Sequence, residues 1–330
     1  MKTPASAAAA RVRVRVRGMG VVSAAGGNVQ ETLATFRAGT RRYGPVTVFP
    51  AEHDGPVFEA RVPPGAGDAS RTRDLLRLAL REALADAGLD PATALRGPRV
   101  GICLGTTVAS QLNDLPFYTA FRRDGVADMR AIDRFLRGNL AEALARELGA
   151  SGPCVTIVNA CSSGADAIGT ALGWIRSGRC DTAVAGGADE LNRVPLFGFR
   201  SLGIVSSEPC APFDRDRRGL NLGEGAGVLV LERVEPGTPC GPGLTLEGYG
   251  GAGDAHHLTA PRPDGSGLEA AVREALREAA VEPGEIAFVN AHGTATRDND
   301  EVEGKVLARL FGAGARMLST KGYTNRKSVV

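Results

Sequence analysis

The chain is organised around residues 155–164, which read Val-Thr-Ile-Val-Asn-Ala-Cys-Ser-Ser-Gly. A β-branched apolar run ends in a polar turn that carries Cys161, and apolar residues then recur at helical spacing as far as Ile175. This order predicts a strand, a cysteine and the start of a helix. The unpaired N–H groups of a first helical turn stabilise a thiolate and, later, an oxyanion on an attacked carbonyl. On this stretch alone, a reactive thiol and a buried structural cysteine are equally good interpretations.

The totals exclude several classes of protein. The 330 residues, of which 43% are hydrophobic, suit two domains or one doubled domain with a sizeable core. A net charge of +2 gives no general attraction to nucleic acid or membranes, and no apolar run is long enough to cross a bilayer. The six cysteines show no zinc-like spacing with the four histidines, which indicates a reducing cytoplasm. Residues 1–10 lack the apolar core of a signal peptide and are expected to form a disordered tail.

The rest of the first half predicts alternating strands and helices. Residues 11–17 alternate arginine and valine, which favours a half-exposed edge strand over a nucleic-acid arm, and residues 18–23 are interpreted as a glycine-bounded turn. A phosphate-binding loop at residues 223–227 is excluded, because these glycines lead into a strand rather than a helix. Helices are expected at 31–38, 74–87, 140–148 and from 165 to a stop at 178, with a helical excursion at 109–138. Strands are expected at 100–104, 155–158, 182–185 and 228–231.

An internal echo predicts a duplicated fold. Residues 81–91 read REALADAGLDP and resemble residues 273–283, which read REALREAAVEP. Each copy is followed by a strand that runs into Gly-Thr, at 105–106 and at 293–294. The shared order favours duplication over chance and predicts two α/β halves packed sheet to sheet. The second half is expected to hold a helix at 271–279, strands at 286–290 and 317–319, and a helix that starts with a capping box at 298–301.

A histidine follows the strand predicted at 286–290. Residues 290–296 read Asn-Ala-His-Gly-Thr-Ala-Thr and place His292 in a loop at a strand end, where sites form in doubly wound α/β folds. Cys161 lies at the corresponding end of its own strand, so the two loops can bring a nucleophile and its partner together. Taken with Cys161, a functional role for His292 is favoured over that of a structural loop histidine.

Five motifs in this order resemble the β-ketoacyl-acyl-carrier-protein synthases. They are Asn-Ala-Cys-Ser-Ser-Gly at 159–164, Pro-Phe-Asp at 212–214, Gly-Glu-Gly-Ala-Gly at 223–227, Asp-Ala-His-His-Leu-Thr-Ala-Pro at 254–261 and His-Gly-Thr-Ala-Thr at 292–296. The resemblance runs from Gly18 to about Thr324, and polyketide ketosynthases are a near relative. It implies a thiolase-like, duplicated α/β/α/β/α layered fold of the α/β class. A tail and basic strand at 1–17 would precede a nucleophile-bearing half at 18–243 and a second half at 244–330.

The resemblance also implies a reaction that needs no cofactor. Cys161 would take an acyl chain from an acyl carrier protein, malonyl carrier protein would lose CO2, and its carbanion would attack the acyl thioester. His292 would donate a hydrogen bond to the enolate oxygen, and Lys321 with Glu303 match the family's supporting charged pair. Asp300 lies in the same motif, although an acid favoured by the helix dipole is at least as good an interpretation. The implied partners are acyl carrier protein and a second chain, in a homodimer or a ketosynthase-like heterodimer.

After Thr324 the sequence departs from the family pattern. The family continues with Gly-His, which supplies the second histidine of its Cys-His-His triad, whereas residues 325–330 read Asn-Arg-Lys-Ser-Val-Val. The family's later helix and closing strands also have no counterpart, so we expect a C-terminally truncated second half with low stability and weak activity. Two alternatives therefore stay open beside the full synthase: a non-catalytic partner subunit, and a remnant that loads an acyl group without condensing it.

Overall fold

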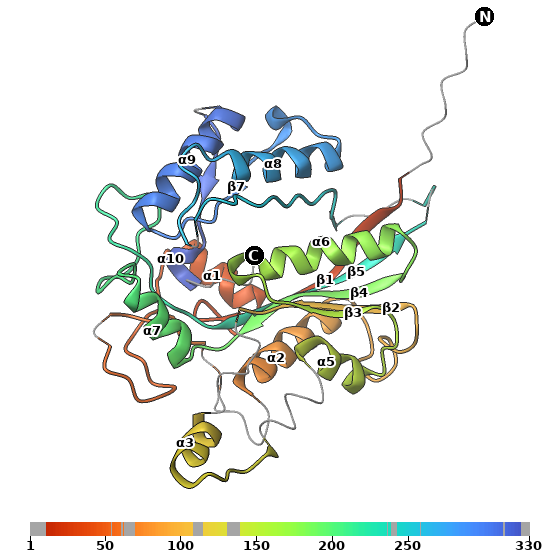
Figure 1. The fold of residues 1–330 in the computed structure, drawn as a ribbon. Helices are drawn as coiled ribbons and strands as arrows, with labels where there is room; N and C mark the ends of the chain where they lie inside the picture. Colours follow the sequence, from red (N-terminus) through yellow and green to blue (C-terminus); the bar gives the residue numbers. More distant parts are fainter. Residues whose placement is uncertain are drawn as a thin grey trace, which may run out of the picture.

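A computed structural model of the protein describes residues 11–53, 55–60, 62, 70–107, 115–130, 139–235, 237–238, 243–257, 259–312 and 314–324. The predicted tail at 1–10, the chain end at 325–330 and part of the excursion at 109–138 lie outside these residues. A six-stranded sheet with the strand order β3-β2-β4-β5-β1-β6 forms the first half (Figure 1). Its strands are β1 Arg13–Ser23, β2 Val100–Gly105, β3 Cys154–Ile157, β4 Thr182–Asp189, β5 Gly225–Val234 and β6 Leu244–Thr245. β3 and β4 are parallel, as predicted, with β2 between them.

Helices cover both faces of this sheet (Figure 1). α2 Arg71–Asp86 and α5 Leu140–Leu148 pack on one face, and α6 Ser163–Arg176 packs on the other. The alternation of side chains along β4 serves both cores, because Val184 packs toward α2 and α5 whereas Ala185 packs toward α6. The remaining helices of this half are α1 Val29–Ala38, α3 Leu115–Asp124 and α7 Arg193–Ser201.

The turn predicted at residues 18–23 is wrong, because β1 continues through them and stays paired with β5. The two glycines instead allow α2 to approach the strand. A Cβ on Gly18 would lie 2.6 Å from the backbone nitrogen of Ala87, and a Cβ on Gly20 would lie 2.8 Å from that of Ala83. Glycine therefore marks a close backbone contact here rather than a change of direction.

The alternating arginines of β1 are paired within the sheet. Arg15 Nε and Arg17 Nη1 each donate to the Glu232 carboxylate of β5 at 2.6 Å. β6 pairs with the outer edge of the strand at Arg15 and Val16. The basic face thus has a partner inside the fold, in agreement with a strand rather than a nucleic-acid arm.

The same glycine contact recurs in the second half and gives the duplication a physical form. A Cβ on Gly248 would lie 2.8 Å from the backbone nitrogen of Ala279, and a Cβ on Gly250 would lie 2.6 Å from that of Ala275. Both alanines lie on α8 Ser266–Ala279 and are the repeat counterparts of the two that contact β1. Each half therefore packs a Gly-x-Gly segment on the same face of an equivalent helix, which confirms the predicted duplication.

The second half is smaller than the first. It contains α8, α9 Arg297–Phe311, α10 Lys321–Thr324 and a parallel pair of strands, β7 Val289–Asn290 and β8 Met317–Leu318. α6 lies between the six-stranded sheet and α8, so helices lie between and outside the halves (Figure 1). Among the described residues the second sheet has two strands against six in the first, as expected for an incomplete half. α9 begins at Arg297 with Thr296 as its N-cap, so the capping box predicted at 298–301 is wrong.

Candidate active site

Cys161 lies in a single 3-10 turn, η2 Ala160–Ser162, between the end of β3 and the start of α6. Ala160 has φ 48°, a left-handed conformation that is strained for a residue with a Cβ. The Ser163 hydroxyl spans the turn, since it accepts from the Asn159 backbone N–H at 2.8 Å and donates to the Ala160 carbonyl at 2.8 Å. The half-buried Cys161 side chain is therefore held in a defined turn at the N-terminal end of α6.

The start of α6 sits directly against the carboxyl end of β2. A Cβ on Gly105 would lie 2.5 Å from the backbone nitrogen of Gly164, so only glycine allows this approach. Because α6 has 14 residues, its N-terminal end carries the positive pole of a full helix dipole. Negative charge on the Cys161 sulfur or on a nearby carbonyl oxygen is favoured at this position.

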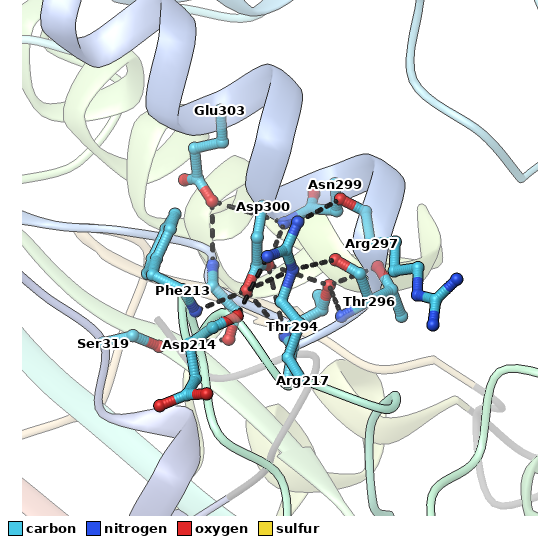
Figure 2. A network of polar contacts seen from close by, with 12 residues as sticks. Phe213, Asp214, Arg217, Thr294, Thr296, Arg297, Asn299, Asp300, Glu303 and Ser319 are labelled. Atoms are coloured by element: carbon cyan, nitrogen blue, oxygen red, sulfur yellow. Dashed lines mark hydrogen bonds and ion pairs between the residues drawn. The ribbon is translucent and has the colours of Figure 1, made fainter.

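His292 follows β7, and Glu303 of α9 holds its backbone. The Glu303 carboxylate accepts from the backbone N–H groups of His292 at 2.6 Å and Gly293 at 2.8 Å. Figure 2 shows Glu303 extending from α9 to this loop. Burial raises the pKa of Glu303, and the two N–H groups oppose that rise. Glu303 thus fixes the loop that carries the imidazole.

Lys321, at the start of α10, links the histidine to the cysteine. Its Nζ lies 3.1 Å from His292 Nδ1, and the residue is 8% exposed. Burial lowers the pKa of Lys321, whereas negative charge on Cys161, Glu303 and Asp300 raises it. The five residues singled out from the sequence therefore surround or include one buried lysine, and both halves of the chain contribute to the cluster.

Asp300 joins the histidine loop to the Pro-Phe-Asp motif. Its carboxylate accepts from the backbone N–H groups of Phe213 at 2.7 Å and Ala295 at 3.1 Å (Figure 2). These two residues have φ 62° and 63°, so one buried carboxylate stabilises two strained turns. Arg217 Nε lies 3.9 Å from the same carboxylate. The helix dipole accounts for only part of the role of Asp300, since these contacts reach outside α9.

Sequence reasoning missed the residues that hold α10. Arg41 donates to the Gly322 carbonyl at 2.6 Å and to the Cys210 carbonyl, and the Cys210 thiol donates to the Lys321 carbonyl at 3.6 Å. Burial raises the pKa of the Cys210 thiol. Arg41 and Gly322 are 281 residues apart in the chain, and nothing in the pattern around either residue signals the contact.

His256 and His257, which match a family motif, lie in an exposed loop. His257 Nδ1 accepts from the backbone N–H groups of Thr259 at 3.2 Å and Ala260 at 3.1 Å, as in the structural role predicted for it. In the described part of the chain, no group of three or more His, Cys, Asp or Glu residues is arranged to hold a metal ion. No helix among the described residues has the length and apolar character needed to cross a membrane.

Comparison with known protein families accounts for the duplicated fold and the motifs together. Residues 51–236 match the family model described as "Beta-ketoacyl synthase, N-terminal domain", and residues 244–327 match "Beta-ketoacyl synthase, C-terminal domain". The chain belongs to the β-ketoacyl synthase family.

Relatives of this β-ketoacyl synthase chain occur among curated proteins and solved structures. It is 33% identical over 263 residues to 3-oxoacyl-[acyl-carrier-protein] synthase 2 of Staphylococcus aureus, a match that covers 75% of this chain and 64% of the relative. The chain therefore spans somewhat less than two thirds of the length of that curated relative. A structure titled "The ishigamide ketosynthase/chain length factor" matches with a TM-score of 0.86 and 33% identity, over 96% of this chain and 82% of that one.

A second solved structure shows the same fold at lower identity. It describes a type II polyketide synthase acyl carrier protein in complex with its ketosynthase bound to the hexaketide, and matches with a TM-score of 0.83 and 26% identity. The match covers 95% of this chain and 82% of that chain. These likenesses confirm the thiolase-like α/β fold predicted for this synthase-family chain.

Proposed function

We propose that the chain carries out a decarboxylative Claisen condensation as a β-ketoacyl-acyl-carrier-protein synthase. The Cys161 thiolate attacks an acyl thioester on acyl carrier protein, the carrier thiol leaves, and the acyl group remains on the sulfur. Malonyl-acyl carrier protein then loses CO2, and the resulting enolate carbon attacks the acyl-cysteine carbonyl. The Cys161 thiolate leaves, and the product is a 3-oxoacyl carrier protein two carbons longer.

The observation that carries this proposal is the position of Lys321 between the His292 ring and the charge of Cys161. A Lys321 ammonium that donates to His292 Nδ1 leaves the imidazole proton on Nε2, so the neutral ring is a hydrogen-bond donor. A donor aimed at the enolate oxygen is worth about 10²–10³ in rate. Glu303 and Asp300 support this arrangement by fixing the backbone on either side of His292.

We assign acyl carrier protein, acylated or malonylated, as the substrate partner, and a second ketosynthase-like chain, identical or different, as the subunit partner. The titles of the two structural relatives support these partners, because one names a chain length factor and the other an acyl carrier protein. The five described cysteines are free, which favours a reducing cytoplasm. We keep the division into halves at 18–243 and 244–330 as part of the proposal.

Mass spectrometry of the intact protein tests this function. Incubation with acyl-acyl carrier protein is expected to add one acyl group at Cys161, and malonyl-acyl carrier protein is expected to discharge it as the 3-oxoacyl product. Cys161→Ala is expected to take up no acyl group, whereas Cys154→Ala, which removes an exposed thiol on β3, loads normally. A native protein that stays unacylated at Cys161 contradicts the proposal.

A second candidate is a subunit that loads an acyl group or only partners a catalytic chain. The likeness to a ketosynthase/chain length factor structure favours this candidate. Loading of Cys161 without malonyl-dependent formation of a 3-oxoacyl product would support a loading subunit over the full synthase.

A further inference from the structure

Asp166 and Tyr249 lie behind the turn that carries Cys161, and neither belongs to the cluster around Lys321. Asp166 is in the first turn of α6, and its Oδ2 accepts from the Asn159 side-chain amide at 2.7 Å and the Ser162 hydroxyl at 2.9 Å. Its other oxygen, Oδ1, accepts from the Tyr249 hydroxyl at 2.6 Å. Residues on both sides of the nucleophile are therefore tied to one carboxylate.

The turn needs such support because its conformation is strained. Ala160 has φ 48°, and a residue with a Cβ keeps such a conformation only where the surrounding contacts fix it. The Ser162 hydroxyl also accepts from the Asn159 side-chain amide at 2.9 Å and donates to the Asn159 carbonyl at 3.1 Å. Asp166 completes this network, and Tyr249 fixes Asp166.

The second half of the chain places Tyr249. Its ring lies over Gly169 of α6, where a Cβ would lie 2.5 Å from a ring carbon, so the glycine makes room for the ring. Its backbone N–H donates to Glu278 of α8 at 2.6 Å, and Glu278 pairs with Arg176 of α6 at 2.5 Å. Burial and the bond to Asp166 raise the pKa of Tyr249 to about 12, so the phenol remains a donor.

We propose that Tyr249 and Asp166 are positioning residues for the nucleophile, and that they act through Asn159 and Ser162 to hold Cys161 in the geometry from which it attacks an acyl thioester. The inference rests on the proposed function for its substrate class. It also assigns the second half a role at the nucleophile itself, beyond the supply of His292 and Lys321.

Two reactions at Cys161 test the proposal in the full chain. The first is alkylation by iodoacetamide, and the second is acylation by an acyl-N-acetylcysteamine thioester, with Cys154 followed by tandem mass spectrometry as the internal reference. Tyr249→Phe keeps the ring and removes the hydroxyl, and Tyr118→Phe, at an exposed tyrosine of α3, is the matched control. Tyr249→Phe is expected to lower the maximal acylation rate about 10-fold, as for a lost hydrogen bond to a charged group, with the half-saturating thioester concentration unchanged. Alkylation of Cys161, but not of Cys154, is expected to slow as well.

A double-mutant cycle separates positioning from general support of the fold. If the hydroxyl acts through the carboxylate, Tyr249→Phe has no further effect on either rate in an Asp166→Ala background. Asp166→Asn retains an acceptor oxygen and is expected to recover part of the rate lost in Asp166→Ala. This pair decides the question should Tyr249→Phe fail to fold.

The proposal is overturned if folded Tyr249→Phe keeps both Cys161 rates within about twofold of native, or if the two substitutions are additive. It is also overturned if Cys154 and Cys161 slow equally, because that indicates a general loosening of the fold. A native chain that accepts no acyl group refutes the proposed function instead, and the iodoacetamide rates then still decide whether Tyr249 and Asp166 position the thiol.

Discussion

Replacing Glu190 with glutamine is expected to remove a pH dependence of stability that the fold builds in. Glu190 follows β4 and is 4% exposed; its Oε2 accepts from the Thr72 backbone N–H at 2.8 Å. Its Oε1 is buried without a hydrogen-bond partner among the described residues. Burial, opposed by Thr72 and reinforced by the charges of Glu224 and Asp189, raises the pKa of this carboxyl to about 7 from 4.5.

The sign and size of the effect follow from these two values. Below pH 4.5 the carboxyl is protonated in both states, and its full contribution to stability is present. As the pH rises through about 7, the folded state is forced to ionise a buried carboxyl, and about 3 kcal/mol of stability is lost. Glutamine resembles the protonated acid, so Glu190→Gln is expected to match native stability at pH 4.5 and to exceed it by up to about 3 kcal/mol at pH 8.

Urea unfolding at several pH values measures this difference. Trp174 is the only tryptophan and is buried in α6, so its fluorescence reports on the core. Glu208→Gln, at a side chain that is 60% exposed, is the matched control and is expected to keep the native pH dependence. The reasoning is refuted if Glu190→Gln unfolds with the same dependence on pH as the native chain.

Three further substitutions test the site and the duplicated packing. Lys321→Met is expected to lower condensation about 10²–10³-fold and to spare acyl loading of Cys161, since it removes the donor to His292 Nδ1; equal loss of both steps, measured by quenched-flow mass spectrometry, would contradict this. Asp300→Ala leaves two buried N–H groups without their acceptor and is expected to lower the free energy of unfolding by about 2–4 kcal/mol in urea; a change within error would refute its role. Gly20→Ala is expected to lower the melting temperature by an amount equivalent to about 1–3 kcal/mol, whereas Gly284→Ala, at a site with open space around it, is neutral; equal shifts would argue against the close contact with α2.

The first half of the fold was largely predictable, because its signals are local. A β-branched run, a cysteine and helical spacing located Cys161 between β3 and α6. Glycine was ambiguous, since a turn and a close backbone contact both call for it. Gly18 and Gly20 serve the second purpose, which is visible only once α2 lies against β1. The start of α9 was placed too late because Thr296 and Asp298 are both acceptable N-cap residues.

The candidate site divides in the same way. The motifs identified Cys161 and His292, and the resemblance added Lys321. Arg41 and Tyr249 carry no local signal, because what each does depends on a partner far along the chain. A tyrosine between two glycines reads as strand packing until the helix beneath it is known.

The most direct test of the account is a single-turnover experiment on chains already acylated at Cys161. Malonyl-acyl carrier protein is added, and CO2 release and the 3-oxoacyl product are followed together in native protein, in His292→Ala and in the exposed-loop control His257→Ala. We predict that His292→Ala retains its acyl group and loses both CO2 release and product formation by about 10²–10³, while the control behaves as native. Decarboxylation and condensation at the native rate in His292→Ala would contradict the central claim that the cluster around Lys321 stabilises the enolate.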